Sequence, residues 1–304
     1  MKPLDLQVNG YAGVDFSSLK LTGEELRRAC EAIRKDGAFQ ILATVITDQI
    51  EHLEKKLSRL VALREEDELI RKVVAGFHIE GPFLSPEPGY IGAHPSSLTK
   101  HANIEDACRL LDAANGLTKI VTLAPEVDQG GRVTRFLSNE GVVVSAGHTN
   151  ASRDELRIAL DQGLSMVTHL GNGCPVELPR HENIIQRILS FRESLWIGFI
   201  PDGHHVDFFA LKNYLDLIGL ERVFMVTDSI SASGLGLGTY ELSGEPVEVD
   251  ASGAARRPGS ANLSGSTLTM GKLRENLSRY LGLSDSEIEL VVDINPAKAI
   301  SVTK

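Results

Sequence analysis

The sequence predicts a (β/α)8 barrel, a closed ring of eight parallel strands surrounded by helices, on the strength of three observations. Short apolar runs alternate with charged segments of helical period from residue 1 to about residue 235 of the 304-residue chain. Several apolar runs end in His, Glu or Asp, and such barrels build their active sites at the carboxyl ends of their strands. The absence of a Gly-x-Gly-x-x-Gly motif after an early strand disfavours the alternative, a doubly wound open sheet.

The strands and helices of this barrel are expected where short apolar runs and longer charged segments follow each other. In chain order, the expected strands are residues 4–9, 39–46, 73–80, 119–124, 141–147, 164–169, 195–200 and 223–227. The expected helices are residues 22–37, 49–70, 104–114, 130–139, 152–162, 184–192 and 208–218. Thr22 is the expected N-cap of the first helix, and Gly37 is its expected stop signal.

The remainder of the chain follows the eighth predicted strand without a linker, a low-complexity tract or a repeat. A Gly-rich stretch leads into a predicted β excursion at residues 240–249 and a Gly/Ser loop at 259–265. Two further helices are predicted, at residues 268–281 and 284–299. We therefore expect residues 1–304 to form a single catalytic domain, in which residues 236–304 pack on the barrel.

Composition excludes several classes of partner. The net charge of −10 argues against non-specific nucleic-acid binding and against an anionic membrane surface, because both depend on an excess of Lys and Arg. The three cysteines form no Cys-x-x-Cys pair, so neither a disulfide framework nor a zinc ribbon is expected. Without a recognisable secretory signal or an apolar run of about 18 residues, the sequence predicts a soluble, cytoplasmic protein.

Glu80, His148 and His169 each lie at the end of an apolar run and form a candidate metal site. One carboxylate and two imidazoles leave a coordination position open, as a catalytic zinc requires, and iron and manganese are the alternatives. A bound metal polarises a carbonyl and lowers the pKa of its water to about 7, so the site predicts hydrolysis of an amide or ester. The alternative is a surface Glu before a turn and two hydrogen-bonded core histidines.

Other polar residues supply candidate roles in such a hydrolysis. Asp228, at the end of the eighth strand, is the candidate proton acceptor and donor, with an N-cap as the alternative. His94, on a long loop, is the candidate for stabilising the oxyanion, with a solvent-exposed loop histidine as the alternative. His205 is expected to bind substrate. Further donors for an anionic group of the substrate are expected from Asn172, Gly173 and Arg180.

A series of short motifs runs along nearly the whole chain. They are residues 5–10 (DLQVNG), 78–83 (HIEGPF), 122–126 (TLAPE), 145–151 (SAGHTNA), 202–207 (DGHHVD), 226–228 (VTD), 263–266 (LSGS) and 295–299 (NPAKA). Each motif is weak alone. In this order, together, they resemble the N-acetylglucosamine-6-phosphate deacetylases of the amidohydrolase superfamily.

The resemblance implies a TIM barrel of the metal-dependent amidohydrolase type that removes acetate from an N-acetylated amino-sugar phosphate, foremost N-acetylglucosamine 6-phosphate. It implies that the metal ligands are Glu80, His148 and His169, and that Asp228 is the acid/base. It also implies substrate contacts through His94 and His205, and a phosphate near Asn172, Gly173 and Arg180. In this family the site is commonly completed across a dimer, so a homodimer is expected.

Four features of the sequence depart from patterns of the superfamily or the family. Gln7 and Asn9 stand where many amidohydrolases carry His-x-His for a second metal, so a single metal ion is expected. The small β-sandwich domain usual in the family is expected to be absent. Gly171 replaces a bulky residue, which should loosen the pocket, and residues 179–183 keep only the Arg of the family pattern. Two alternatives therefore stay open: a hydrolase of a different N-acyl or cyclic amide, and a non-catalytic, metal-containing sugar-binding barrel.

Overall fold

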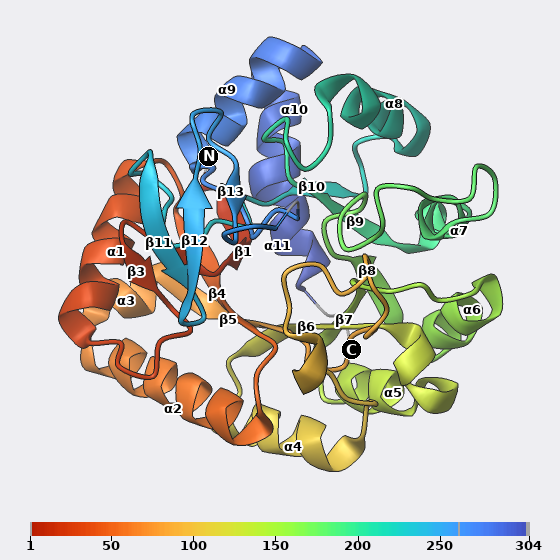
Figure 1. The fold of residues 1–304 in the computed structure, drawn as a ribbon, viewed down its shortest axis with the longest axis horizontal. Helices are drawn as coiled ribbons and strands as arrows, with labels where there is room; N and C mark the ends of the chain where they lie inside the picture. The colour runs from red at the N-terminus through yellow and green to blue at the C-terminus, as the bar shows by residue number, and fades with distance from the viewer. Residues whose placement is uncertain (1, 261, 302–304) are drawn as a thin grey trace.

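The computed structural model describes residues 2–260 and 262–301, and it confirms the predicted barrel (Figure 1). Eight parallel strands are neighbours in the order in which they occur in the chain. They are β1 (Leu4–Val8), β4 (Gln40–Ile46), β5 (Val74–Glu80), β6 (Thr118–Leu123), β7 (Val143–Ala146), β8 (Leu164–Val167), β9 (Trp196–Phe199) and β10 (Val223–Met225). The carboxyl ends of all eight strands therefore face the same side of the molecule.

The ring closes between β1 and the residues that follow β10. Val8 forms an isolated parallel bridge with Ser229. The backbone N–H of Asn9 donates to the Ser229 carbonyl at 2.8 Å. The buried Asp5 carboxylate accepts from the Thr227 hydroxyl at 2.6 Å and from the Thr227 backbone N–H at 3.2 Å. The Asp5 side chain thus helps to join β1 to the segment that follows β10.

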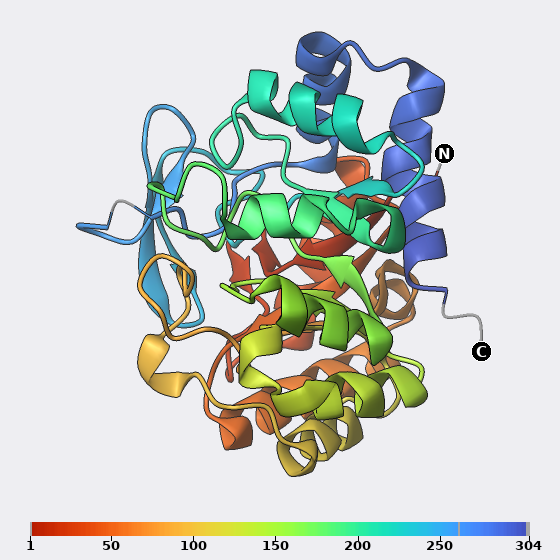
Figure 2. The same ribbon diagram turned by 90° about the vertical axis from the view of Figure 1, so that its right-hand side faces the viewer.

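Helices cover the outside of the ring, as Figure 2 shows. They are α1 (Gly23–Lys35), α2 (Ile50–Glu66), α3 (Glu68–Val73), α4 (Ile104–Ala113), α5 (Arg132–Asn139), α6 (Arg153–Asp161), α7 (Ile184–Leu189) and α8 (Phe208–Ile218). Thr22 is the N-cap of α1, as predicted, and forms a capping box with Glu25. The buried faces of the helices and the strands share one large apolar core. None of the described helices is long and apolar enough to cross a membrane.

The single helix predicted for residues 49–70 is wrong, because Asp67 divides it into α2 and α3. Asp67 has extended backbone angles, φ −130° and ψ 124°. Its carboxylate accepts from the backbone N–H groups of Leu69 at 2.7 Å and Ile70 at 3.1 Å, so it is the N-cap of α3. The apolar period continues across the break, which is why the sequence pattern does not reveal it.

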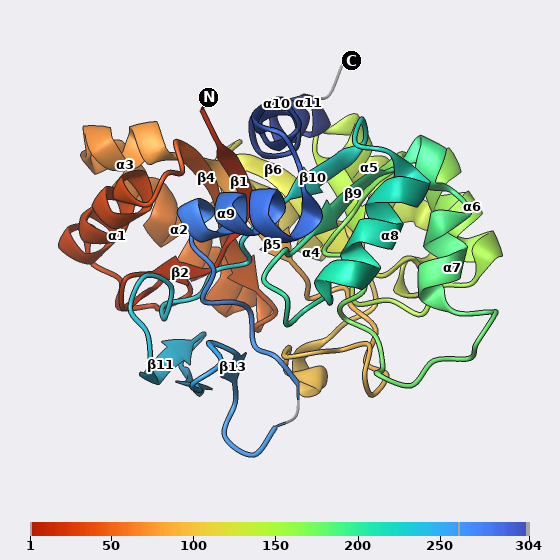
Figure 3. The ribbon, with the colours of Figure 1, turned by 90° about the horizontal axis from the view of Figure 1, so that it is seen from above.

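The C-terminal segments confirm the predicted β excursion and the two predicted helices. The strands β11 (Gly238–Leu242), β12 (Glu245–Val249) and β13 (Ala255–Arg256) form a small antiparallel sheet. A short ribbon of β2 (Gly10–Tyr11) and β3 (Val14–Asp15) follows β1. The helices are α9 (Met270–Leu281), α10 (Asp285–Glu289) and α11 (Asn295–Ala299), with a π-helical turn at Leu290–Ile294 between the last two. Figure 3 shows the small sheet at the end of the barrel opposite α10 and α11.

Candidate active site

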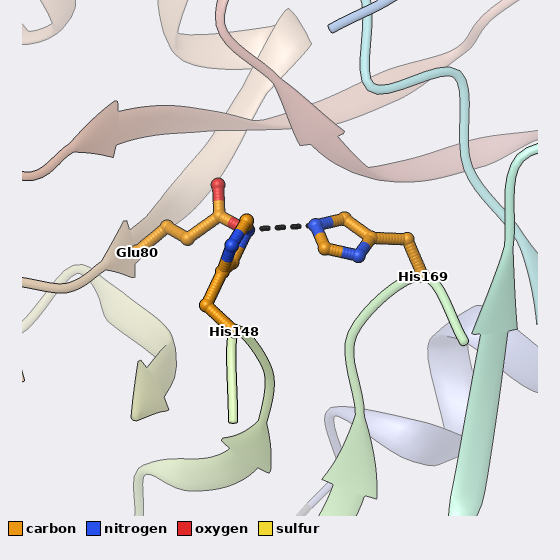
Figure 4. A group of neighbouring side chains, drawn as sticks. All are labelled: Glu80, His148 and His169. Atoms are coloured by element: carbon orange, nitrogen blue, oxygen red, sulfur yellow. Dashed lines mark hydrogen bonds and ion pairs between the residues drawn. The ribbon is translucent and has the colours of Figure 1, made fainter. Parts of the chain in front are cut away.

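Glu80, His148 and His169 form a buried cluster at the carboxyl ends of β5, β7 and β8 (Figure 4). Their exposed fractions are 2%, 7% and 4%. Glu80 Oε1 lies 3.0 Å from His169 Nε2 and 3.4 Å from His148 Nε2. One ligand atom from each of the three residues lies within 4.8 Å of the others. The three side chains predicted to hold a metal are therefore brought together.

Strained backbone marks three residues of this site. His148, His169 and Asp228 follow their strands with φ values of 51°, 32° and 49°. The left-handed region costs roughly 1–2 kcal/mol for a residue with a Cβ. Six of the described non-glycine residues have positive φ, and these three are half of them. Such strain persists only where the surrounding structure enforces it, which is typical of functional sites.

Hydrogen bonds around the cluster direct its ligand atoms inward. His148 Nδ1 lies 3.0 Å from the Tyr90 carbonyl, a contact that holds the ring with its Nε2 toward Glu80. Burial alone would raise the pKa of Glu80, but hydrogen bonds from His148 and His169 hold it well below its ordinary value. Glu80 is therefore a carboxylate at neutral pH. A buried carboxylate with two imidazoles fits a divalent transition metal ion.

Asp228 lies beside this cluster and is 8% exposed. Its Oδ1 accepts a hydrogen bond from Asn9 Nδ2 at 2.7 Å. Burial and the charge of Glu80 raise the pKa of Asp228 to about 7, against smaller opposing effects from neighbours that include His169 and His205. A carboxyl group with this pKa can both accept and release a proton near neutral pH.

His94 is buried against the cluster, which excludes the alternative of a solvent-exposed loop histidine. Its ring meets that of His148 edge-on, with 4.4 Å between the centroids, and its Nε2 lies 3.9 Å from Glu80 Oε2. Its Nδ1 lies 2.9 Å from Thr47 Oγ1. Burial and the charge of His148 lower the pKa of His94 to about 3, so its imidazole is neutral.

His205 differs from His94 in its electrostatics. Its Nδ1 lies 2.6 Å from Asp202 Oδ2. Burial lowers the pKa of His205, but the charge and the hydrogen bond of Asp202 outweigh burial and raise it above the ordinary value. His205 therefore holds a proton more readily than a free histidine, which suits contact with an anionic group.

A single cavity of about 410 Å³ contains most of the predicted site. Of the residues predicted from the sequence, it is lined by Glu80, His94, His148, His169, Asn172, Gly173, His205 and Asp228. Arg180 is exposed and does not line this cavity. The cavity is also lined by residues for which the sequence predicts no role, among them His204, Arg256, Asn262 and Leu263. Arg256, Asn262 and Leu263 come from the segment around β13. Neither a position at the end of a barrel strand nor a helical period in the sequence indicates that this segment lies at the mouth of the barrel.

Gly92 is expected to be essential for the position of His148. A Cβ on Gly92 would lie 2.9 Å from His148 Cε1, closer than real contacts allow. We expect Gly92→Ala to displace the imidazole and to weaken metal affinity about 10- to 100-fold, as measured by competition with a chelator. Gly116→Ala is the matched control, because Gly116 has a similar left-handed φ of 76° but nothing within 4 Å of an added Cβ. Equal affinities in the two variants would contradict this expectation.

A buried Glu-His-His cluster with an aspartate beside it, at the strand ends of a (β/α)8 barrel, defines a metal-dependent hydrolase as the class of protein. The N-acetylglucosamine-6-phosphate deacetylase of Bacillus subtilis (strain 168) is 31% identical over 306 residues, which cover 98% of this chain and 74% of the relative. The chain belongs to the N-acetylglucosamine-6-phosphate deacetylase family. Enzymes of this family are metal-dependent.

Two further comparisons agree with this assignment. The N-acetylgalactosamine-6-phosphate deacetylase of Escherichia coli O157:H7 is 28% identical, over 98% of this chain and 77% of the relative. The structure of a variant N-acetyl-D-glucosamine-6-phosphate deacetylase from Mycobacterium smegmatis, in complex with N-acetyl-D-glucosamine-6-phosphate, superposes with a TM-score of 0.89. It is 31% identical and covers 99% of this chain and 77% of its own. No family model matches the chain.

Proposed function

We propose that this protein is a metal-dependent amide hydrolase that removes acetate from an N-acetylated amino-sugar phosphate, foremost N-acetylglucosamine 6-phosphate. The observation that carries the proposal is the buried cluster of Glu80, His148 and His169 in one cavity with Asp228, in a chain of the deacetylase family. We propose one divalent ion at this cluster, zinc foremost, with iron and manganese as the alternatives. When bound, the ion would supply Lewis acidity that polarises the acetyl carbonyl and acidifies a water molecule.

Asp228 carries the proton through the reaction in this proposal. Its carboxylate accepts a proton from the attacking water as the new carbon–oxygen bond forms. It then delivers that proton to the amide nitrogen as the carbon–nitrogen bond breaks, so acetate and a free amino sugar leave. The pKa of about 7 suits both steps. In the tautomer that carries its proton on Nε2, the neutral His94 ring can donate to the developing oxyanion, with Thr47 Oγ1 2.9 Å from its Nδ1.

The phosphate of the substrate is assigned to the side of the cavity that holds His205. The charge and the hydrogen bond of Asp202 give His205 the raised pKa noted above, and Arg256, Asn172 and Gly173 line the same cavity. Arg180, which is exposed outside the cavity, would reach the phosphate from a second subunit, and a homodimer is part of the proposal. A cytoplasmic location is also proposed, supported by three free cysteines.

A panel of three amides tests the proposed reaction and its substrate. Acetate release is measured with N-acetylglucosamine 6-phosphate, N-acetylgalactosamine 6-phosphate and unphosphorylated N-acetylglucosamine, each with metal-loaded protein. The proposal expects efficient turnover of a phosphorylated sugar and a much higher KM without the phosphate. The second sugar is the alternative substrate, because one relative bears that name. The absence of acetate from all three, with metal bound, would overturn the proposal.

Mixed dimers test the proposed role of Arg180. We expect Arg180→Gln to raise KM for the phosphorylated substrate roughly 10- to 100-fold, since charge-assisted hydrogen bonds contribute about 1.5–3 kcal/mol. An Asp228→Asn chain has no proton carrier but keeps its Arg180. Dimers of the two variants would contain one site with both native residues, and that site should show the native KM. A monomeric protein, or mixed dimers with no recovery, would contradict the role of Arg180.

A further inference from the structure

The first strand directs two amide side chains at the two carboxylates of the site. Gln7 Nε2 donates to Glu80 Oε2 at 3.1 Å. Asn9 Nδ2 donates to Asp228 Oδ1 at 2.7 Å. Both amides are 2% exposed. Residues two apart on a strand lie on the same face, which is why β1 and the residue after it reach both carboxylates from one side.

The backbone around these amides is fixed on both sides. Asp5 binds Thr227, the residue before Asp228, through the hydroxyl at 2.6 Å and through the backbone N–H. The Asn9 N–H donates to the carbonyl of Ser229, the residue after Asp228. The segment that carries Gln7 and Asn9 is thus hydrogen-bonded to the residues directly before and after Asp228. A shift of β1 along its axis would break these contacts together.

We infer that Gln7 and Asn9 are positioning residues, which hold one oxygen of Glu80 and one oxygen of Asp228 so that the other oxygen of each carboxylate serves the chemistry. The inference rests on the proposed function. The terminal torsion of a carboxylate is broad, so a hydrogen bond to one oxygen is needed to fix the plane of the group. Glu80 shows the result, because Oε2 is bound to Gln7 while Oε1 faces His148 and His169 (Figure 4).

The chemistry of an amide suits this role better than that of an imidazole. Its N–H groups donate at every pH, and its nitrogen offers no lone pair to a metal ion. Asn9 also retains an acceptor, because its buried Oδ1 has no hydrogen-bond partner among the described residues. Asn9 also lines the cavity that contains Asp228.

The role of Gln7 is tested without any substrate. Gln7→Met keeps the length of the side chain but removes the donor. We expect zinc affinity, measured by competition with a chelator, to fall about 10- to 100-fold, as is typical when a partner of a metal ligand is lost. Native zinc affinity in a folded Gln7→Met protein would overturn the role of Gln7. This result does not depend on which amide the enzyme hydrolyses.

The role of Asn9 is tested by separating kcat from KM. Asn9→Leu should keep one zinc ion per chain and the native KM, while kcat falls about 10- to 100-fold. Asn9→Asp is the second variant in case the first does not fold, because it keeps the shape but has no N–H to donate, and kcat should fall as well. Native kcat in either variant, or a loss of kcat that only follows a loss of zinc, would overturn the role of Asn9.

Asn295→Leu is the matched control for loss of a buried amide. Asn295 is fully buried, and its Nδ2 donates to the carbonyls of Leu220 and Val223 at 2.7 Å each, at the opposite end of β10. Its Oδ1 also lacks a partner among the described residues. This variant should lose stability but keep kcat per bound zinc. If it loses kcat to the same extent as Asn9→Leu, the effect is structural and the inference is wrong.

Wild-type protein without deacetylase activity would overturn the proposed function instead, and the zinc measurement on Gln7→Met would still decide the inference.

Discussion

Asp228→Asn is expected to bind one metal ion per chain and to lose turnover about 10²- to 10⁴-fold, the usual contribution of a general acid–base group. The substitution keeps the shape of the side chain and removes only its ability to carry a proton. Asp228 lies beside the Glu80 cluster and is not one of the three clustered ligands, so metal binding should persist. The measurement is acetate release per bound metal, with metal content determined on the same sample.

The pH profile gives a second check on Asp228. The carboxylate must be ionised to accept a proton, so kcat/KM should fall as pH decreases through its pKa. That pKa is raised to about 7 by burial and by Glu80, and a cation held by Glu80 would lower it. The acidic limb is therefore expected at about pH 7 or below, and it should disappear from the residual rate of Asp228→Asn. A metal-loaded Asp228→Asn protein with native turnover would exclude Asp228 as the proton carrier.

Removal of the metal is the second change with a large expected effect. Stripped protein should release no acetate, and it should unfold at a lower temperature than the loaded form. Binding at a free metal concentration of 1,000 Kd stabilises the folded state by about 4.1 kcal/mol, which corresponds to a rise in Tm of roughly 6 °C for a chain of 304 residues. The structural reason is that Glu80, His148 and His169, three buried side chains that could hold a metal ion, already lie together at the strand ends.

Two variants separate the metal site from the rest of the catalytic machinery in this experiment. Glu80→Gln should lose most of the metal-dependent rise in Tm, because an amide is a poorer ligand than a carboxylate. Asp228→Asn should show the full rise, since it keeps all three ligands. A rise in Tm that is the same in wild type and Glu80→Gln would place the bound metal elsewhere on the protein.

The sequence predicted the parts of the site that lie at strand ends. Glu80, His148, His169 and Asp228 each follow an apolar run, and parallel strands bring such positions to one face of a barrel. The local pattern that places a strand therefore also places its last residue. The same logic predicted the strands and most helices, but it could not detect the break at Asp67, where a side-chain cap interrupts an unbroken apolar period.

Residues whose position depends on tertiary contacts could not be placed in this way. Arg256 lines the cavity because β13 pairs with β12, and no local pattern indicates that the small sheet approaches the barrel mouth. The roles of Gln7 and Asn9 as donors depend on how β1 lies against its neighbours. From the sequence alone, these two residues indicated only that a second metal is not expected. The exposed position of Arg180 likewise depends on the path of its loop.

The most direct test of the account is a titration of stripped protein with zinc, in which acetate release from N-acetylglucosamine 6-phosphate is followed at each step. We expect a rate that rises linearly and reaches its plateau at one zinc ion per chain. The same titration of Glu80→Gln should give little activity at that ratio. Activity in the stripped wild-type protein, a plateau that requires two ions, or no acetate at any zinc concentration would contradict the account.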